Sequence, residues 1–151
     1  MKDFFKRYNL FGYLLLGSAC LTLVSFIWYC VNQTTGYAAG SSVNGWAVTC
    51  FILAFLVEVG CFVFAKKLPK WAHGVSLLVA GALLVVALVI WIMSAVPWAA
   101  DVWFIPVNYP AAEGAALWNA IGGVIIMVVG YCLLIAASVP GSLLKAEEKA
   151  E

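Results

Sequence analysis

The feature that most restricts the fold of this chain is a set of four long apolar runs, each long enough to cross a lipid bilayer. We expect helices over residues 10–31, 45–65, 72–96 and 116–139. At about 1.5 Å per residue each helix covers roughly 30 Å or more, the thickness of the hydrocarbon core. The chain is 66% hydrophobic and 10% charged, whereas soluble domains average about 45–50% and 25%. The sequence therefore predicts a single all-α membrane domain over residues 1–151.

The positive charges predict how these helices are oriented. All 8 Lys and Arg residues fall in three short clusters, at the N-terminus, between the second and third runs, and in the C-terminal tail. They are Lys2, Lys6, Arg7, Lys66, Lys67, Lys70, Lys145 and Lys149. Because positively charged loops stay on the cytoplasmic side, we expect an antiparallel four-helix bundle in the plasma (inner) membrane with both termini cytoplasmic. The net charge of +1 offers no basic field for nucleic acid.

Small residues recur every seven positions along the last three runs, which indicates close helix packing. Small side chains let helix backbones approach each other in lipid, where no hydrophobic force drives helices together. A seven-residue period favours left-handed crossing. The expected packing residues are Ala47, Ala54, Cys61, Ala80, Ala87, Gly123 and Gly130.

Glu58 is the one charged residue inside the four expected helices. An ionisable group at membrane depth is costly and is by default a functional candidate. The other residues on its helix face are small, so we expect Glu58 to point into the bundle. At the helical rise, Ser18 and Tyr131 lie at a similar depth and can donate hydrogen bonds to a carboxyl group. Burial disfavours the charged form, so we expect Glu58 to be neutral much of the time.

Three roles remain open for Glu58. As a protonated carboxyl it could hold two or three helices together. It could instead couple transport to a proton or cation, or pair with a polar or basic group of another subunit. A Gln at this position keeps the hydrogen bonds but does not titrate, so Glu58→Gln separates the first two roles.

The segment between the third and fourth runs, residues 97–115, is apolar but contains three prolines. We expect an outer loop, too rich in proline to be a spanning helix, that covers the mouth of the bundle or lies in the membrane interface. Its aromatic and acidic side chains could also form an interaction surface, because exposed apolar patches mark such sites. The residues of this surface are Trp98, Asp101, Trp103, Phe104, Tyr109 and Glu113.

The five cysteines form no CxxC motif, and the chain has a single histidine, so we expect no metal and no other cofactor. Cys30 and Cys50 both lie near outer helix ends, which leaves a disulfide between them open. Asn32 begins a formal glycosylation sequon, to which we give little weight. His73 is expected at the inner membrane interface.

These features favour a non-catalytic membrane protein, because the sequence offers no nucleophile–base pair, metal cluster or phosphate-binding loop. The first hypothesis is an accessory subunit that binds another membrane protein or copies of itself. The alternative is a small oligomeric transporter or channel-like protein with Glu58 as the coupling site. Beyond the lipid bilayer, the sequence identifies neither a partner nor a small-molecule substrate.

Overall fold

The computed structural model describes residues 8–39, 42–65, 67–105 and 111–139 of the chain. Its long elements are the α-helices α2 (Leu10–Thr34), α3 (Gly45–Val63), α4 (Lys70–Phe104) and α5 (Ala111–Ser138), with a short 3-10 helix η1 (Gly36–Ala38) after α2. The described residues contain no strand. All four long helices are long and apolar enough to cross a membrane. The all-helical membrane fold expected from the sequence is confirmed.

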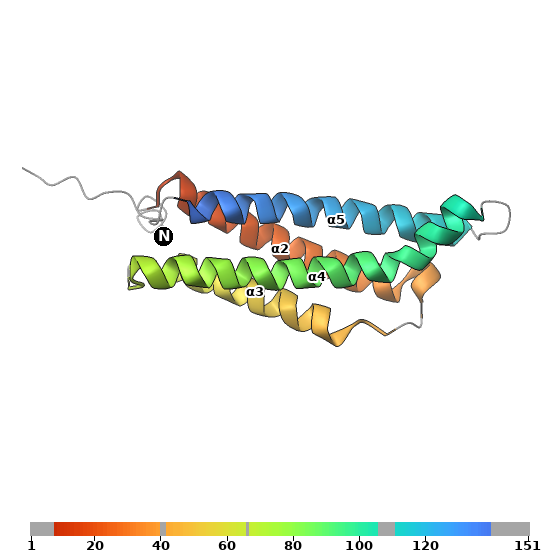
Figure 1. Ribbon diagram of the computed structural model, residues 1–151, viewed down its shortest axis with the longest axis horizontal. Coiled ribbons are helices and arrows are strands. Elements are labelled where there is room, and N and C mark those ends of the chain that lie inside the picture. Colours follow the sequence, from red (N-terminus) through yellow and green to blue (C-terminus); the bar gives the residue numbers. More distant parts are fainter. Residues whose placement is uncertain (1–7, 40–41, 66, 106–110, 140–151) are drawn as a thin grey trace, which may run out of the picture.

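The four long helices run alternately up and down and lie side by side (Figure 1). Around the bundle, α2 packs on α3, α3 on α4, α4 on α5, and α5 closes the ring against α2. We call the end at which α2 and α4 finish the distal end, and the end at which α2 and α4 begin the proximal end. With 19 residues, α3 is the shortest of the four helices and still covers about 29 Å at the helical rise.

Asparagine side chains fix the starts of two helices. The side chain of Asn9 accepts a hydrogen bond from the Gly12 amide at 3.0 Å, and that of Asn44 accepts from the Trp46 amide at 3.0 Å. Such N-caps satisfy amide groups that have no partner within the helix. The first two helices thus begin where the sequence predicts, and α3 ends close to the expected boundary.

The region around Pro97 differs from the sequence prediction. Residues 97–104 continue α4, and α5 begins at Ala111 instead of residue 116, so the expected loop over residues 97–115 is largely helical. Figure 1 shows α4 changing direction near its C-terminal end, where Pro97 lies inside the helix. Proline removes one backbone donor and bends a helix, but the residues on either side can keep the helix going. The sequence argument treated Pro97 as a stop, whereas the structure shows a bend.

Small side chains form the helix contacts. All seven expected packing residues are buried, and Ala47, Ala54, Ala80 and Ala87 are fully inaccessible. A Cβ atom built on Gly130 would lie 3.0 Å from the Leu21 Cβ, so α2 and α5 meet there at almost backbone contact. This close approach positions the polar groups of α2 against α5 and α3.

Candidate functional site

Glu58 lies on the inward face of α3 and is completely buried, with 0% of its surface exposed. Its Oε1 atom accepts hydrogen bonds from the Ser18 hydroxyl at 3.0 Å and from the Thr22 hydroxyl at 3.4 Å, both on α2. Its Oε2 atom is also buried and has no hydrogen-bond partner within the described residues. One carboxyl oxygen is therefore held by α2, while the other lacks a partner in a region where buried polar atoms are almost always paired.

Ser18 joins three helices at this point. Its Oγ atom lies 3.0 Å from Glu58 Oε1 on α3 and 2.9 Å from the backbone carbonyl oxygen of Gly130 on α5. A hydroxyl group has one proton to donate. When that proton goes to Gly130, the Ser18 oxygen is free to accept a hydrogen bond from a protonated Glu58. A neutral Glu58 carboxyl group can therefore donate to Ser18 while Ser18 donates to Gly130, which satisfies both contacts of the Ser18 hydroxyl. A Glu58 carboxylate accepts a hydrogen bond from Ser18 only if the hydrogen bond from Ser18 to Gly130 breaks.

Tyr131, the second partner considered from the sequence, lies elsewhere. Its ring packs beside Gly81 of α4, where a Cβ atom would meet the Tyr131 ring at 3.4 Å and its hydroxyl at 3.9 Å. It also borders a hollow between α4 and α5. Within the described residues, the hydrogen bonds to Glu58 come from Ser18 and Thr22 instead. Depth along the membrane was similar, but Tyr131 lies on a different face of α5.

Above Glu58, toward the distal end, the bundle is filled by aromatic rings. Tyr29, Phe51 and Trp91 are fully buried, and their ring centroids lie 5.4 to 6.4 Å apart. Gly123 of α5 makes room for this cluster, because a Cβ atom there would stand 2.2 Å from the Trp91 ring. The rings separate α2 from α4 and fix how far apart the helices can lie.

The expected outer-loop surface divides into two parts. Trp98 and Asp101 lie in the last turns of α4, and Glu113 lies in the first turn of α5 with only 2% of its surface exposed. Tyr37 of η1 lies between these residues, with an edge-on contact to the Trp98 ring and an electrostatic interaction with the Glu113 side chain. The negative charge of Glu113 raises the pKa of the Tyr37 hydroxyl above its ordinary value. From the sequence, Glu113 was expected in the outer loop, whereas it lies in the first turn of α5 and is buried there.

Two other members of that surface face outward. Trp103 is 58% exposed and Phe104 is 82% exposed, at the end of α4. Tyr109 lies outside the described residues. The part of this surface that is free to contact lipid or a partner is therefore the end of α4.

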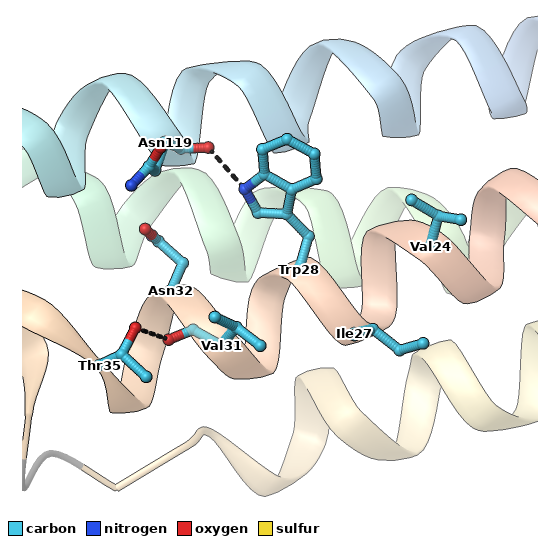
Figure 2. A pocket seen from close by; sticks show the side chains of 7 residues that line it. All are labelled: Val24, Ile27, Trp28, Val31, Asn32, Thr35 and Asn119. Atoms are coloured by element: carbon cyan, nitrogen blue, oxygen red, sulfur yellow. Dashed lines mark hydrogen bonds between the residues drawn. The ribbon is translucent and has the colours of Figure 1, made fainter.

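A partly open hollow of about 430 Å³ lies beside α2 toward the distal end (Figure 2). Figure 2 shows Trp28 and Asn32 projecting from α2 toward α5, where the Trp28 indole nitrogen donates to the backbone oxygen of Asn119 at 3.1 Å. Val24, Ile27 and Val31 supply the aliphatic lining, and Thr35 completes it. The hollow is thus apolar toward the middle of the bundle and polar toward the distal end.

Asn32 lines this hollow, yet only 6% of its surface is exposed and its Nδ2 atom is buried without a partner in the described part of the chain. A glycan attached to this nitrogen would require the side chain to leave the bundle. The burial therefore argues against use of the sequon.

The remaining candidates stay apart from Glu58, with one exception. Cys30 and Cys50 are free thiols, so the disulfide left open by the sequence is not formed. His73 is buried at the proximal end of α4, and neither ring nitrogen has a partner within the described residues. Cys61, the exception, interacts electrostatically with Glu58 and lies near Ser76 of α4.

Sequence reasoning missed most of the polar residues on α2. Thr22, Ser25, Tyr29 and Asn32 are buried together with Ser18 on one face of this helix. Their spacing of three and four residues was visible in the sequence and is the pattern of a single helix face. The pattern stands out only once Glu58 is placed beside it.

Comparison with known protein families, with curated protein sequences and with solved structures found no match.

Proposed function

We propose that this protein is a small membrane protein, working as an oligomer, in which Glu58 binds and releases a proton or a monovalent cation during transport. The observation that carries the proposal is the state of the Glu58 carboxyl group. It is fully buried, one oxygen is held by Ser18 and Thr22, and the other has no partner in the described residues. Keeping such a group in the membrane is costly, and ionisable residues retained there mark ion and proton pathways.

The charge of the site favours a monovalent ion. Cys61 is the titratable group that interacts electrostatically with Glu58 in the described part of the protein, and a thiol is ordinarily neutral. The oxygens gathered here are those of the Glu58 carboxyl group, two hydroxyls and the Gly130 carbonyl. A proton or a monovalent cation would neutralise the single carboxylate, whereas a divalent cation would leave a net positive charge in a medium of low dielectric. Oxygen ligands of this kind suit hard cations.

A flux assay tests this role against a purely structural one. Wild-type protein and Glu58→Gln are reconstituted in liposomes with a pH-sensitive dye inside, and either a potassium diffusion potential or a sodium gradient is applied. Gln keeps hydrogen-bonding groups next to Ser18 but does not titrate. We expect wild-type liposomes to change internal pH faster than empty ones in one of the two conditions, and Glu58→Gln to abolish the difference. Equal rates for wild type and Glu58→Gln in both conditions would refute the proposal.

A second candidate function is that of an accessory subunit, and the hollow beside α2 favours it. The hollow is open, lined mainly by apolar side chains, and flanked by exposed Ile27 and Val31. A transmembrane helix of a partner would bury these side chains. Under this function, Ile27→Trp should fill the hollow and abolish co-purification of a stoichiometric partner in mild detergent. Leu78→Trp, at an exposed position on α4, is the matched control and should keep the partner.

We further propose that the protein resides in the plasma membrane with both termini cytoplasmic, as the positive clusters favour. The turn after α3 carries Lys67, and Lys70 opens α4, so the proximal end would face the cytoplasm. Reporter fusions at Leu68 and at Ile105 test this orientation. A cytoplasmic reporter at Ile105, or an external one at Leu68, would contradict it.

A further inference from the structure

The face of α2 that meets Glu58 continues as a row of buried polar residues toward the distal end. Ser18, Ser25 and Tyr29 are fully inaccessible, and Thr22 and Asn32 are 2% and 6% exposed. Successive members are three or four residues apart, so they lie above one another on one side of the helix. The row covers about 21 Å along the axis at the helical rise. It begins at the hydrogen bonds to Glu58 and ends at Asn32, in the wall of the distal hollow.

Most of this row is not satisfied by the protein. The hydroxyl of Ser25, the hydroxyl of Tyr29 and the Nδ2 atom of Asn32 are buried without hydrogen-bond partners in the described residues. The Tyr29 hydroxyl faces the backbone amide of Asn44 at the start of α3, but outside hydrogen-bonding geometry. The Nε1 atom of Trp91, whose ring contacts Tyr29, is also unpartnered.

Unpartnered buried donors and acceptors at such a density point to bound water. Buried polar groups in proteins are almost always paired, and where the protein offers no partner an internal water supplies one. Neighbours at three- and four-residue spacing have Cβ atoms about 5–6 Å apart, a separation that one water molecule can bridge. The row therefore has the chemistry and the spacing of a chain of side chains and waters.

We propose that this row conducts protons between the distal hollow and Glu58, so that Glu58 exchanges its proton with the distal side of the membrane. The inference deepens the proposed function and rests on it. In the forward direction, the water next to Glu58 transfers a proton to the carboxylate and takes one from its neighbour in the row. The last proton is replaced from water at the Asn32 end, and release reverses each step.

A competing route would lead to the proximal end. Cys61 lies one turn from Glu58 on α3, lies near Ser76 of α4, and borders a third hollow that also includes Lys67. This route offers one thiol and one hydroxyl, compared with three hydroxyls, a phenol and an amide on the distal side. Within the described residues, Glu58 accepts hydrogen bonds from Ser18 and Thr22 of α2 and interacts with the Cys61 thiol of α3, while Ser18 also contacts the Gly130 carbonyl oxygen of α5.

Hydrogen–deuterium exchange of the Glu58 carboxyl group separates the two routes. Infrared spectroscopy of the protein in lipid nanodiscs follows the carboxylic acid C=O band after transfer to deuterated buffer, and Glu58→Gln identifies the band by its loss. Ser25→Val removes the hydroxyl in the middle of the row and leaves two methyl groups on the Cβ atom. Tyr29→Phe removes only a hydroxyl and keeps the ring contacts with Phe51 and Trp91, so it tests the row even if Ser25→Val fails to fold. Ser76→Val is the matched control on the proximal route.

We expect Ser25→Val and Tyr29→Phe each to slow exchange by about tenfold, the rate effect of one lost hydrogen bond of about 1.4 kcal/mol. Ser76→Val should exchange at the wild-type rate. Wild-type rates in both distal variants, or slowing by Ser76→Val alone, would overturn the distal route. Loss of flux in Glu58→Gln together with unchanged exchange in the distal variants would reject the route and leave the proposed function standing. Flux that does not depend on Glu58 would reject the proposed function, whatever the exchange rates are.

Discussion

Replacing Gly123 with alanine should strongly destabilise the bundle, and the structure allows the size of the effect to be worked out. The new Cβ atom would stand 2.2 Å and 2.6 Å from two ring atoms of Trp91 and 3.1 Å from an atom of the Trp28 ring. Ordinary carbon contacts are about 3.5–4.0 Å. Trp91 is fully buried between Tyr29 and Phe51, so it has little room to move away.

The expected loss is about 2 kcal/mol. Overpacking a core costs about 1–3 kcal/mol, and the upper value applies here because Trp91, the nearer partner, is fully buried and held by its neighbours. Replacing a helical glycine with alanine returns up to about 1 kcal/mol of helix propensity. A net loss of about 2 kcal/mol lowers the ratio of folded to unfolded protein roughly 30-fold.

Gly122 is the matched control, one residue away on the same helix. A Cβ atom there would meet Trp28 at 3.7 Å, an ordinary contact. Gly122→Ala should therefore be neutral or stabilising by up to about 1 kcal/mol. Reversible unfolding in mixed detergent micelles, measured by circular dichroism, compares both variants with wild type. Equal stability of the two variants would refute the packing of Trp91 against α5.

Two further predictions concern hydrogen bonds and charge. Ser18→Ala should lower the free energy of unfolding by about 2 kcal/mol in the same assay, because the Glu58 Oε1 atom and the Gly130 carbonyl oxygen both lose the Ser18 hydroxyl. Thr22→Val should lower it by under about 1 kcal/mol, since the hydrogen bond of Thr22 is long. Equal losses would count against Ser18 as the residue that joins three helices. Glu113→Gln should lower the pKa of Tyr37, because the nearby negative charge is the main cause of its raised value, so phenolate absorbance should develop at lower pH than in wild type. Subtracting the titration of Tyr37→Phe isolates this residue, and an unshifted titration would show that the two side chains are apart.

The length and apolar character of four runs were enough to predict the bundle, and depth along the helices was enough to place Ser18 near Glu58. Depth alone failed for Tyr131, because two residues at one level can face different neighbours, and only packing decides the rotation of α5. The predicted end of α4 at residue 96 was wrong because Pro97 bends this long apolar helix without ending it. The burial of Glu113 was not predicted, because it depends on α5 beginning at Ala111 and not at residue 116. The polar face of α2 was readable from its spacing but gained meaning only beside the carboxyl group.

The most direct test of the central claim is an infrared pH titration of the Glu58 carboxyl group in liposomes. The account predicts a carboxylic acid band that is absent in Glu58→Gln and that converts reversibly to a carboxylate band while the bundle remains folded. A band of constant intensity over the whole pH range in which circular dichroism shows intact helices would contradict it, and would leave Glu58 as a fixed hydrogen-bonding group between α2 and α3.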